Sequence, residues 1–538
     1  MRWNAKVADS PFHILVSDHL GQTGWDILRA SQDVTTTGPL PDRKAVLAEV
    51  PRAHALVLRS QTHADAELIA HAQQLRVIAR AGAQLENVDI DAATRRGIMV
   101  MNVPDANVIA VAEHTMALLL ALARQIPQGY ASIRAGRWER HEMLGFQLRG
   151  KTIGVIGYGR HGHEVANRGQ AFGMEVLAYD PYTDIAHART QGVSIVPLQE
   201  LLARADVISL HTSLTNETRN FLNSDTFSQM KTGVRIINCA RAELIDEQAL
   251  LHALNTDKVA EAALDTFCEE PTPPDHPLVQ HPNVVAVPHL NQNTMESQRE
   301  TSRLVVEQTL DALRQEDYRC VVNLPFRPGA EYTVYKPYLR LAEQLGKLQA
   351  QLAHGRINRV ELELQGDGLR NIVRPVAAAM LKGMLYQLDD HTVNYVNAPL
   401  IAHEQGIETA QVVGLELVDY PNLLSCRVHW EDGGSQTIAG VVFAGAETRL
   451  VQYQDFQVDV RPEGTLLMLE NRDVPGVIGK VGTYLGSHDI NIGGWRYGRD
   501  RTGGRAISFI NLDSECPANV VQALRSLPDV FDARLITL

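Results

Sequence analysis

Three glycines between a short apolar run and a helix-length segment constrain the fold of this chain most strongly. They stand as Gly157-x-Gly159-x-x-Gly162, directly after the run Thr152–Ile156. In this setting the first glycine permits a tight turn, the second lets the backbone approach a pyrophosphate, and the third lets helix and strand pack closely. The free N–H groups at the start of the following helix attract anions. The segment therefore predicts a strand–turn–helix unit that binds a dinucleotide.

An acidic residue indicates which dinucleotide this unit prefers. Asp180 follows the next apolar run, 18 residues after Gly162. Its carboxylate suits the ribose hydroxyls of NAD and repels the 2′-phosphate of NADP, and Pro181 and Tyr182 bring no cation. NAD is the predicted cofactor, and a glycine turn without a nucleotide is the alternative. Inside the motif, His161 either donates to the pyrophosphate or faces solvent.

Short apolar runs alternate with helix-length segments from Phe12 to about Val322. Runs rich in Val, Ile and Leu are typical of parallel strands that are covered on both faces. The alternation therefore predicts an α/β chain with doubly wound parallel sheets. The expected strands lie in the sequences HILVSD, HALVLRS, LRVIARAG, IMVMN, TIGVIGYG, EVLAYD, DVISLHT, VRIINCA and NVVAVPH.

Two breaks rich in Pro and Gly, Asn323–Ala330 and Arg461–Gly464, divide the remainder of the chain. Between them we expect an α+β segment that begins with a helix over Pro337–His354. After the second break the order strand, helix, strand, strand, helix, strand predicts a ferredoxin-like βαββαβ unit.

Composition excludes several classes of protein. Of the residues, 45% are hydrophobic and 21% are charged, which is ordinary for a globular chain, and the net charge of -13 argues against a nucleic-acid surface. The five cysteines form no C-x-x-C pair, so we expect reduced thiols, no disulfide frame and no metal site. Met1–Ser17 lacks the apolar run of a secretory signal, and Met116–Ala123 is too short to span a bilayer. These features predict a cytoplasmic protein without a membrane partner.

Three sequence pieces resemble the D-isomer-specific 2-hydroxyacid dehydrogenase family: N-C-A-R at 238–241, A-L-D-x-F-x-x-E-P at 263–271 and V-P-H-L at 287–290. By this resemblance Arg241, Glu270 and His289 match the catalytic residues of the family. Such a reaction needs a base for the hydroxyl proton, a carboxylate that orients the imidazole and a guanidinium that binds the substrate carboxylate. Each residue alone fits a structural or surface position. All three in the family's order favour the catalytic interpretation.

The resemblance extends over most of the chain. The pieces R-S-Q-T at 59–62, R-A-G at 80–82, A-E-H-T at 112–115 and G-R-W-E-R at 136–140 look like the phosphoglycerate dehydrogenase branch of the family. They imply a phosphorylated hydroxy acid as substrate, with Arg59 and Arg140 for its phosphate; surface charge is the alternative for each arginine. The implied substrate residues are Arg59, Ser60, Gly82, Ala83, Gln84 and Arg140. The implied cofactor residues are Gly157, Gly159, Arg160, His161, Gly162, Asp180, Thr212, Cys239, Ala240 and Asp265.

Similar pieces mark the C-terminal half. V-N-Y-V-N-A-P at 393–399 resembles the intervening, allosteric substrate-binding domain of long phosphoglycerate dehydrogenases, and D-x-P-G at 473–476 with I-N-I at 490–492 looks like an ACT domain. Such a domain implies an amino-acid effector, often serine, and a structural cap is the alternative. The implied effector residues are Asp473, Pro475, Gly476 and Asn491.

The resemblance also implies domain boundaries and an assembly. A flavodoxin-like substrate domain would comprise residues 12–104 and 291–325, and a Rossmann NAD domain residues 105–290. The intervening domain would occupy residues 330–460 and the ACT domain residues 465–538. The family forms homodimers or homotetramers through its cofactor domains, so the same is expected here.

Several loops depart from the family pattern. Where the family has Gly-x-Gly, the chain reads Gly82-Ala83-Gln84, and where it has two glycines after the catalytic Arg, the chain has Ala242-Glu243. Asn291-Gln292-Asn293 replaces a usual Gly-Ala-Ser, Glu86 a usual Asp, and Val108 a usual Thr or Ser. Added carboxylates disfavour a dianionic phosphate ester. Three functions therefore stay open: NAD-dependent oxidation of 3-phosphoglycerate for serine synthesis, oxidation of a different 2-hydroxy acid, and an idle amino-acid-binding regulator. The catalytic trio argues against the last of these.

Overall fold

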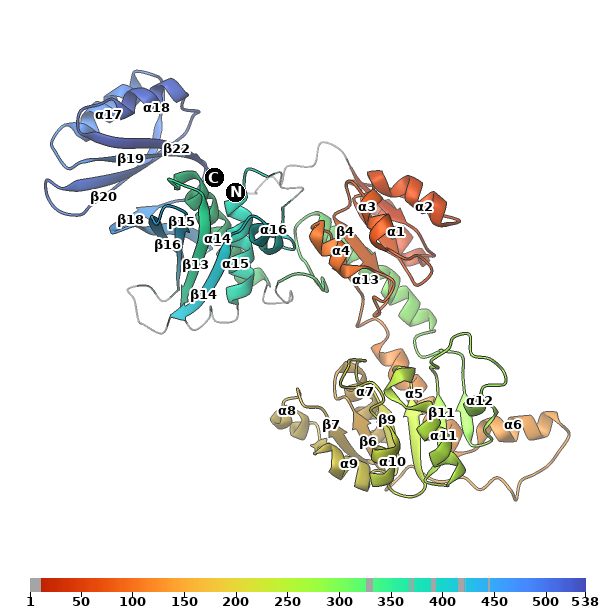
Figure 1. The fold of residues 1–538 in the computed structure, drawn as a ribbon. Coiled ribbons are helices and arrows are strands. Elements are labelled where there is room, and N and C mark those ends of the chain that lie inside the picture. Colours follow the sequence, from red (N-terminus) through yellow and green to blue (C-terminus); the bar gives the residue numbers. More distant parts are fainter. Residues whose placement is uncertain are drawn as a thin grey trace. The chain divides into compact units, whose positions relative to one another are not determined.

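The structure is a computed structural model that describes residues 11–325, 332–366, 369, 372–388, 393–414, 420, 422–443 and 446–538 (Figure 1). The first ten residues of the segment expected to lack a signal, and residues 326–330 of the expected linker, lie outside these ranges. The chain divides into two compact units. One comprises 21–26 and 103–304, and the other comprises the remaining segments.

The N-terminal sheet has five parallel strands in the order β2-β1-β3-β4-β5. This is the flavodoxin-like order, which confirms the predicted fold of the first sheet. Its elements are β1 (Phe12–Val16), α1 (Gln22–Ala30), β2 (Val34–Thr37), α2 (Arg43–Glu49), η1 (Val50–Arg52), β3 (Ala55–Leu58), α3 (Ala66–His71), β4 (Val77–Arg80), α4 (Ile90–Arg95) and β5 (Met99–Met101).

The second sheet has seven parallel strands in the order β12-β11-β10-β9-β6-β7-β8. The strand order reverses at β6, which lies between β7 and β9, and ligands bind at such a point. The predicted Rossmann fold is confirmed. Its elements are α5 (Val108–Ala123), α6 (Ile126–Arg134), β6 (Thr152–Ile156), α7 (Arg160–Ala171), β7 (Glu175–Tyr179), α8 (Ile185–Thr190), β8 (Ser194–Ile195), α9 (Leu198–Arg204), β9 (Val207–Leu210), α10 (Ser224–Gln229), β10 (Val234–Asn238), η2 (Ala242–Leu244), α11 (Glu247–Asn255), β11 (Val259–Leu264), α12 (Pro277–Gln280) and β12 (Val284–Ala286). The following helix, α13 (Met295–Leu313), contains residues of both compact units.

Apolar side chains cover both faces of this second sheet. One buried cluster joins α5 and α7 to the strands, and another joins α9, α10 and α11 to them. This two-sided burial explains why the strands read as continuous apolar runs. Across the described residues, no single helix meets the length and hydropathy of a membrane span, and the bent pair α5 and α6, with 62° between its helices, meets them by length and composition only.

The third sheet is mixed and has the order β14-β13-β15-β16-β17-β18. Only β13 and β14 pair in parallel among its described strands, and the other pairs are antiparallel. The predicted α+β segment is confirmed. Its elements are α14 (Tyr332–Leu352), β13 (Ile357–Gln365), α15 (Val373–Met384), α16 (Ala398–Glu404), β14 (Glu408–Gly414), β15 (Leu423–Trp430), β16 (Ser435–Phe443), β17 (Glu447–Tyr453) and β18 (Phe456–Val460).

The fourth sheet is antiparallel, with the order β20-β21-β19-β22. Two helices complete the predicted βαββαβ sequence of elements, which is confirmed. They are β19 (Thr465–Arg472), α17 (Val477–Gly486), β20 (Ile492–Arg499), β21 (Arg505–Leu512), α18 (Ala518–Arg525) and β22 (Val530–Thr537).

The structure adds elements that the sequence pattern did not predict. Strand β2 reads Val-Thr-Thr-Thr and lies at a sheet edge, so it lacks the apolar run that marks the central strands. Helix α14 begins at Tyr332, before Pro337, which lies inside it. Pro337 lies in the second turn and has no N–H, so one intrahelical hydrogen bond is missing there. Helix α6 has exposed apolar side chains and therefore gave no core-facing pattern.

Helices α14 and α15 cross at two glycines. A Cβ atom added to Gly346 would lie 2.1 Å from the carbonyl oxygen of Met380, and one added to Gly383 would lie 2.1 Å from that of Glu343. Real Cβ atoms do not approach carbonyl oxygens so closely. The helices therefore pack backbone against backbone at this point, and only glycine fits there.

We predict that Gly346→Ala destabilises the chain. Alanine favours a helix over glycine by about 1 kcal/mol, but forcing the helices apart costs about 1–3 kcal/mol, so the packing cost prevails. Gly479→Ala in α17 is the matched control, because a Cβ there meets no atom within 4 Å and the substitution should stabilise. Calorimetric unfolding midpoints test both, and a midpoint of Gly346→Ala at or above that of the parent chain would contradict the close crossing.

Candidate active site

The glycine motif forms the turn that its spacing predicts. Gly157 follows β6 with φ +91°, and a Cβ on it would lie 2.7 Å from the backbone nitrogen of Thr212, after β9. A Cβ on Gly162 would lie 2.0 Å from the carbonyl oxygen of Gly157, so helix α7 packs directly on the turn. A Cβ on Gly159 meets nothing within 4 Å, which leaves open space beside the first turn of α7. These residues fit a bound pyrophosphate.

Asp180 lies at the end of β7 beside this turn. One carboxylate oxygen accepts from the backbone N–H of Tyr158 at 2.9 Å, and the other accepts from that of Tyr182 at 2.8 Å. The carboxylate is thus held at the position where the ribose of a dinucleotide is bound in this fold. Its contact with the ribose stays a prediction.

His161 has a partner that neither sequence interpretation foresaw. Its Nε2 lies 3.3 Å from Oδ1 of Asn107, which must accept because it is a carbonyl oxygen. Burial, and then the charge of Arg160, lower the pKa of His161, so the ring is neutral at neutral pH. Asn107 Nδ2 in turn donates to Oε1 of Gln292 at 3.4 Å. A chain of side chains therefore connects the glycine turn to the loop that follows β12.

That loop carries His289 next to Glu270. Nδ1 of His289 lies 3.0 Å from Oε2 of Glu270, and the two side chains are 25% and 41% exposed. The other oxygen of Glu270 accepts from the backbone N–H of Phe267 at 3.2 Å. His289 has φ 51°, an uncommon conformation for a non-glycine residue, which turns the chain after β12. The predicted couple is therefore formed in the same unit as the glycine turn.

A buried carboxylate holds this loop. Asp265 is 0% exposed, and its Oδ1 accepts from His114 Nε2 at 3.0 Å and from the backbone N–H of Leu290 at 2.7 Å. Its Oδ2 accepts from the backbone N–H of Asn291 at 3.1 Å, and its carbonyl oxygen accepts from that of His289 at 2.9 Å. Sequence reasoning placed Asp265 at the cofactor and gave His114 no role. The A-E-H-T piece was the available signal for His114.

Arg241, Cys239 and Ala240 follow β10. Nδ2 of Asn238 donates to the carbonyl oxygen of Arg241 at 2.7 Å, and Oδ1 accepts from the backbone N–H of Ala240 at 3.0 Å, so one buried amide shapes the turn. Arg241 is half-buried. Burial raises the pKa of the Cys239 thiol to about 12, so it stays protonated.

Metal-ligand atoms of His114, Cys239 and Asp265 lie within 4.8 Å of one another. Hydrogen bonds already occupy both carboxylate oxygens of Asp265. Cys239 is a thiol rather than the thiolate that binds metals. The group therefore serves as a hydrogen-bonded support, and a metal-free site stays the prediction.

The predicted substrate loops lie in the other unit, after β3 and β4. The backbone N–H of Arg59 donates to Oδ2 of the buried Asp18 at 2.6 Å, and the carbonyl oxygen of Arg59 accepts from Asn87 at 2.6 Å. Gly82 has φ +150°, and a Cβ there would lie 1.8 Å from a guanidinium nitrogen of Arg80. Ala83 accepts from Asn102 Nδ2 at 2.6 Å. Ser60 is exposed and Gln84 is half-buried.

Comparison with known proteins decides the family. Residues 116–291 match the NAD binding domain of D-isomer specific 2-hydroxyacid dehydrogenases, and residues 334–454 match the D-3-phosphoglycerate dehydrogenase intervening domain. D-3-phosphoglycerate dehydrogenase of Methanocaldococcus jannaschii is 39% identical over 98% of this chain and 99% of its own. The D-3-phosphoglycerate dehydrogenase of Bacillus subtilis is 37% identical over 98% of this chain and 100% of its own.

The chain belongs to the 2-hydroxyacid dehydrogenase family. Among solved structures, a glyoxylate reductase from Paecilomyes thermophila is similar with a TM-score of 0.52 and 32% identity, over 57% of this chain and 96% of that one. The TT0316 protein from Thermus thermophilus is similar with a TM-score of 0.53 and 35% identity, over 58% of this chain and 100% of that one. The chain is thus an NAD-binding dehydrogenase that resembles phosphoglycerate dehydrogenases, as its sequence predicted.

The polar residues that distinguish this dehydrogenase from the family pattern have partners of their own. Asn291 Nδ2 donates to the carbonyl oxygen of Cys239 at 2.8 Å, and Oδ1 of Asn293 accepts from Gln298 at 2.8 Å. The carbonyl oxygen of Glu243 accepts from the backbone N–H of Asn220 at 2.8 Å. The side-chain amides of Asn291 and Asn293 are therefore hydrogen-bonded within the protein, whereas the contact at Glu243 involves only its backbone.

The remaining predicted site residues lie farther along the chain. Arg140 is exposed on the segment after α6, which Figure 1 shows extending from the seven-stranded unit. In the βαββαβ domain, the carboxylate of Asp473 accepts from the Tyr497 hydroxyl at 2.7 Å, from Arg499 at 3.2 Å and from the Gly503 N–H at 3.1 Å. These contacts, the one with Tyr497 first, lower the pKa of Asp473.

The other predicted effector residues lie close by in this domain. Gly476 begins α17 with φ +96°, and Nδ2 of Asn491 donates to Asp513. Pro475 lies between Asp473 and Gly476 in the turn. An effector role for all four residues stays a prediction.

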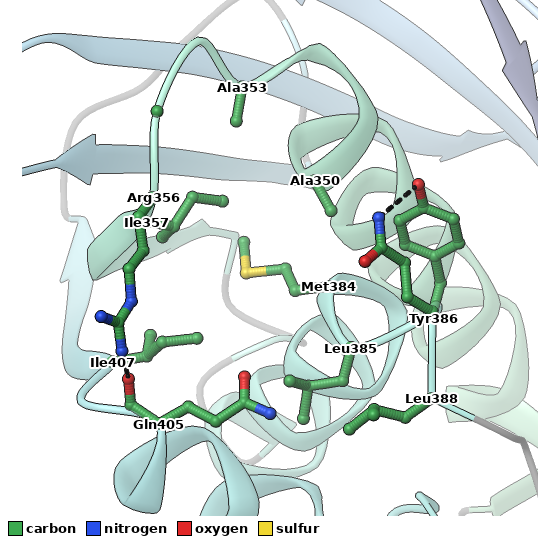
Figure 2. A pocket seen from close by; sticks show the side chains of 12 residues that line it. Ala350, Ala353, Arg356, Ile357, Met384, Leu385, Tyr386, Leu388, Gln405 and Ile407 are labelled. Atoms are coloured by element: carbon green, nitrogen blue, oxygen red, sulfur yellow. Dashed lines mark hydrogen bonds between the residues drawn. The ribbon is translucent and has the colours of Figure 1, made fainter.

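The intervening domain contains a pocket of about 260 Å³ that sequence reasoning missed (Figure 2). Met384, Leu385 and Ile407 supply apolar lining, and the Arg356 guanidinium donates to the carbonyl oxygen of Gln405 at 3.0 Å. Its residues come from helix ends and strand starts that lie far apart in sequence, so no local motif announces it.

We predict that Asp265→Asn destabilises the enzyme and weakens catalysis. The NH₂ group of asparagine would then face an N–H group that now donates to the carboxylate. Two donors cannot pair, and leaving them without acceptors costs about 1–3 kcal/mol of stability. Asp275→Asn, an exposed change nearby, is the control and should be neutral. Thermal unfolding and turnover measure the two effects, and unchanged values for Asp265→Asn would refute the role of this carboxylate.

Proposed function

We propose that this dehydrogenase oxidises 3-phosphoglycerate to 3-phosphohydroxypyruvate with NAD, the first step of serine synthesis. The observation that carries the proposal is the 3.0 Å pair of His289 and Glu270 in the unit that holds the glycine turn. Relatives described as D-3-phosphoglycerate dehydrogenase match almost the whole chain, the intervening segment included, which supports the choice of substrate.

The geometry of the pair assigns a role to each nitrogen of the imidazole. Nδ1 faces the carboxylate of Glu270, so it carries a proton and Nε2 is left to accept the proton of the substrate hydroxyl. Glu270 then stabilises the imidazolium that forms. NAD, when bound, accepts the hydride from the carbon that bore this hydroxyl.

Arginines supply the cations that the two anionic ends of the substrate need. Arg241 follows the carboxyl end of β10, and doubly wound folds bind ligands at the carboxyl ends of their strands. Its guanidinium can form two parallel hydrogen bonds with a carboxylate. Arg59 and Arg140 are our candidates for the phosphate. The backbone of Arg59 is held on both sides by Asp18 and Asn87, which supports a formed loop.

A different 2-hydroxy acid is the second candidate. The chain places Gln84 and Glu243 in loops where the family has small residues, and the carboxylate that Glu243 adds repels a dianionic phosphate ester. Glu86 replaces a usual Asp and leaves the charge unchanged. This alternative keeps the same hydride chemistry and changes only the acid.

The decisive assay follows NADH absorbance with 3-phosphoglycerate and with a panel of unphosphorylated 2-hydroxy acids. We expect 3-phosphoglycerate to be the best substrate and His289→Ala to lower turnover by about 10² to 10⁴-fold, because the base is lost. NAD affinity should change little. His252→Ala, an exposed histidine on α11, is the matched control. Preference for another acid would establish the second candidate, and a nearly normal rate of His289→Ala would exclude this histidine as the base.

We further propose that the βαββαβ domain binds an amino acid, with serine as the first candidate. The turn from Asp473 to Gly476 and the nearby Asn491 support a ligand site at this end of the domain. The Asp473 carboxylate itself accepts hydrogen bonds from Tyr497 and Arg499. We also propose a homo-oligomer, because Tyr130, Trp138 and other large apolar side chains are exposed on and after α6.

Serine should raise the unfolding temperature of the parent chain as its concentration increases, since a ligand that binds only the folded state stabilises it. Asn491→Ala should abolish this rise, and D-serine serves as the control ligand. If neither serine nor other amino acids move the transition, the domain is a structural cap.

A further inference from the structure

A second carboxylate, that of Glu247, contacts the segment that carries Glu270. Glu247 is the first residue of α11, and its Oε1 accepts from the backbone N–H of Cys268 at 3.3 Å. Its other oxygen, Oε2, lies 3.4 Å from Nε2 of His276, and the side chains of Glu247 and His276 are 25% and 18% exposed. Glu247 therefore connects α11 to both ends of the stretch from Cys268 to His276, and Glu270 lies within that stretch.

Helix α11 does not depend on this carboxylate for its cap. The side chain of Asp246, the residue before the helix, already accepts from the backbone N–H groups of Gln248 and Ala249. An acid in the first turn of a helix also interacts favourably with the helix dipole, which is the purely structural explanation for a glutamate here. The contacts of Glu247 with the segment after β11 are additional to that effect.

The imidazole of His276 joins the same carboxylate to the start of this segment. Its ring meets the ring of the buried Phe267 edge-on, with 5.7 Å between the centroids and 76° between the planes. Nδ1 of His276 is buried without a hydrogen-bond partner among the described residues, so Glu247 supplies the polar contact that orients the ring. The backbone N–H of Phe267 donates to Oε1 of Glu270 at 3.2 Å. The contacts of Glu247 thus extend to Glu270 through the residues that precede it.

We propose that Glu247 is a positioning residue of the active site, which sets the place of the Glu270 carboxylate beside His289. Glu270 and His289 are 41% and 25% exposed, so packing alone does not fix the 3.0 Å contact between them. Glu247 holds the backbone at Cys268, two residues before Glu270. The proposal rests on the roles proposed above for Glu270 and His289 and does not depend on which hydroxy acid is oxidised.

Two substitutions of Glu247 separate the reach of this side chain from its charge. Glu247→Asp keeps the charge at the start of α11 but is one methylene shorter, so it loses the contacts with Cys268 and His276. Glu247→Gln loses the charge but keeps the length and an oxygen that accepts from the Cys268 N–H, and the imidazole can accept from its NH₂ group in the other tautomer. We expect Glu247→Asp to lower turnover about ten- to hundredfold, because small misplacements at an active site slow a reaction strongly. Glu247→Gln should retain turnover, whereas a role through the helix dipole alone predicts the reverse order.

Turnover is followed by NADH absorbance with the best hydroxy acid of the panel. It is expressed per NAD-binding site counted by calorimetry, so that unfolded protein does not enter the rate. In Glu247→Asp, kcat should fall while KM for the acid and the affinity for NAD change little, because the proposal gives Glu247 no contact with either ligand. Asp225→Ala removes an exposed acid from the first turn of α10 and is the matched control, which should keep the turnover of the parent chain.

A double-mutant cycle with Glu270 decides the case in which both variants of Glu247 lose turnover. Glu270→Ala should lower turnover, and adding Glu247→Asp should lower it no further, because no carboxylate is left to position. Parent turnover in Glu247→Asp, or losses that multiply in the double variant, overturn the positioning role and leave the proposed function intact. Parent turnover in Glu270→Ala, or no oxidation of any acid by the parent chain, contradicts the proposed function itself, and the positioning role fails with it.

Discussion

The buried carboxylate of Asp265 is the constraint on which the candidate site depends. An ionised or polar group without solvent must be hydrogen-bonded, and this one accepts from an imidazole on α5 and from two backbone N–H groups of the loop after β12. The same residue's carbonyl oxygen receives the N–H of His289. The backbone of the histidine that pairs with Glu270 is therefore held by hydrogen bonds to Asp265 and by those of its two following residues. A helix, a strand end and a loop meet at one side chain.

The fold was readable from the sequence wherever burial imposes a pattern. Strands such as β3 and β6 are buried along their whole length, so nearly all their residues are apolar, and this pattern predicted them. Edge strand β2 is only partly buried and reads as three threonines after a valine, which any loop permits. Helix α6 presents apolar residues to solvent, so the usual correspondence between apolar residues and core fails there.

The site was predictable only in part. The spacing of Gly157, Gly159 and Gly162 predicts the turn, because the turn is formed by residues close in sequence. The structure shows close contacts at the first and third glycine and open space at the second. The pairing of His289 with Glu270 came from resemblance and was formed as expected, although the catalytic roles themselves stay predictions. The contacts of His114 with Asp265, 151 residues apart, join chain segments through the tertiary fold alone. No spacing rule reveals such pairs.

Asp180 links two properties that are usually discussed separately. The carboxylate that should discriminate between the two nicotinamide dinucleotides also accepts the N–H of Tyr158, inside the glycine turn. Replacing Asp180 to admit the phosphorylated ribose of NADP therefore also removes the hydrogen bond that holds the Tyr158 N–H. That hydrogen bond lies in the glycine turn expected to bind the pyrophosphate. Cofactor choice and loop order are coupled in this chain, so a switch of preference calls for a second substitution that gives Tyr158 a new acceptor.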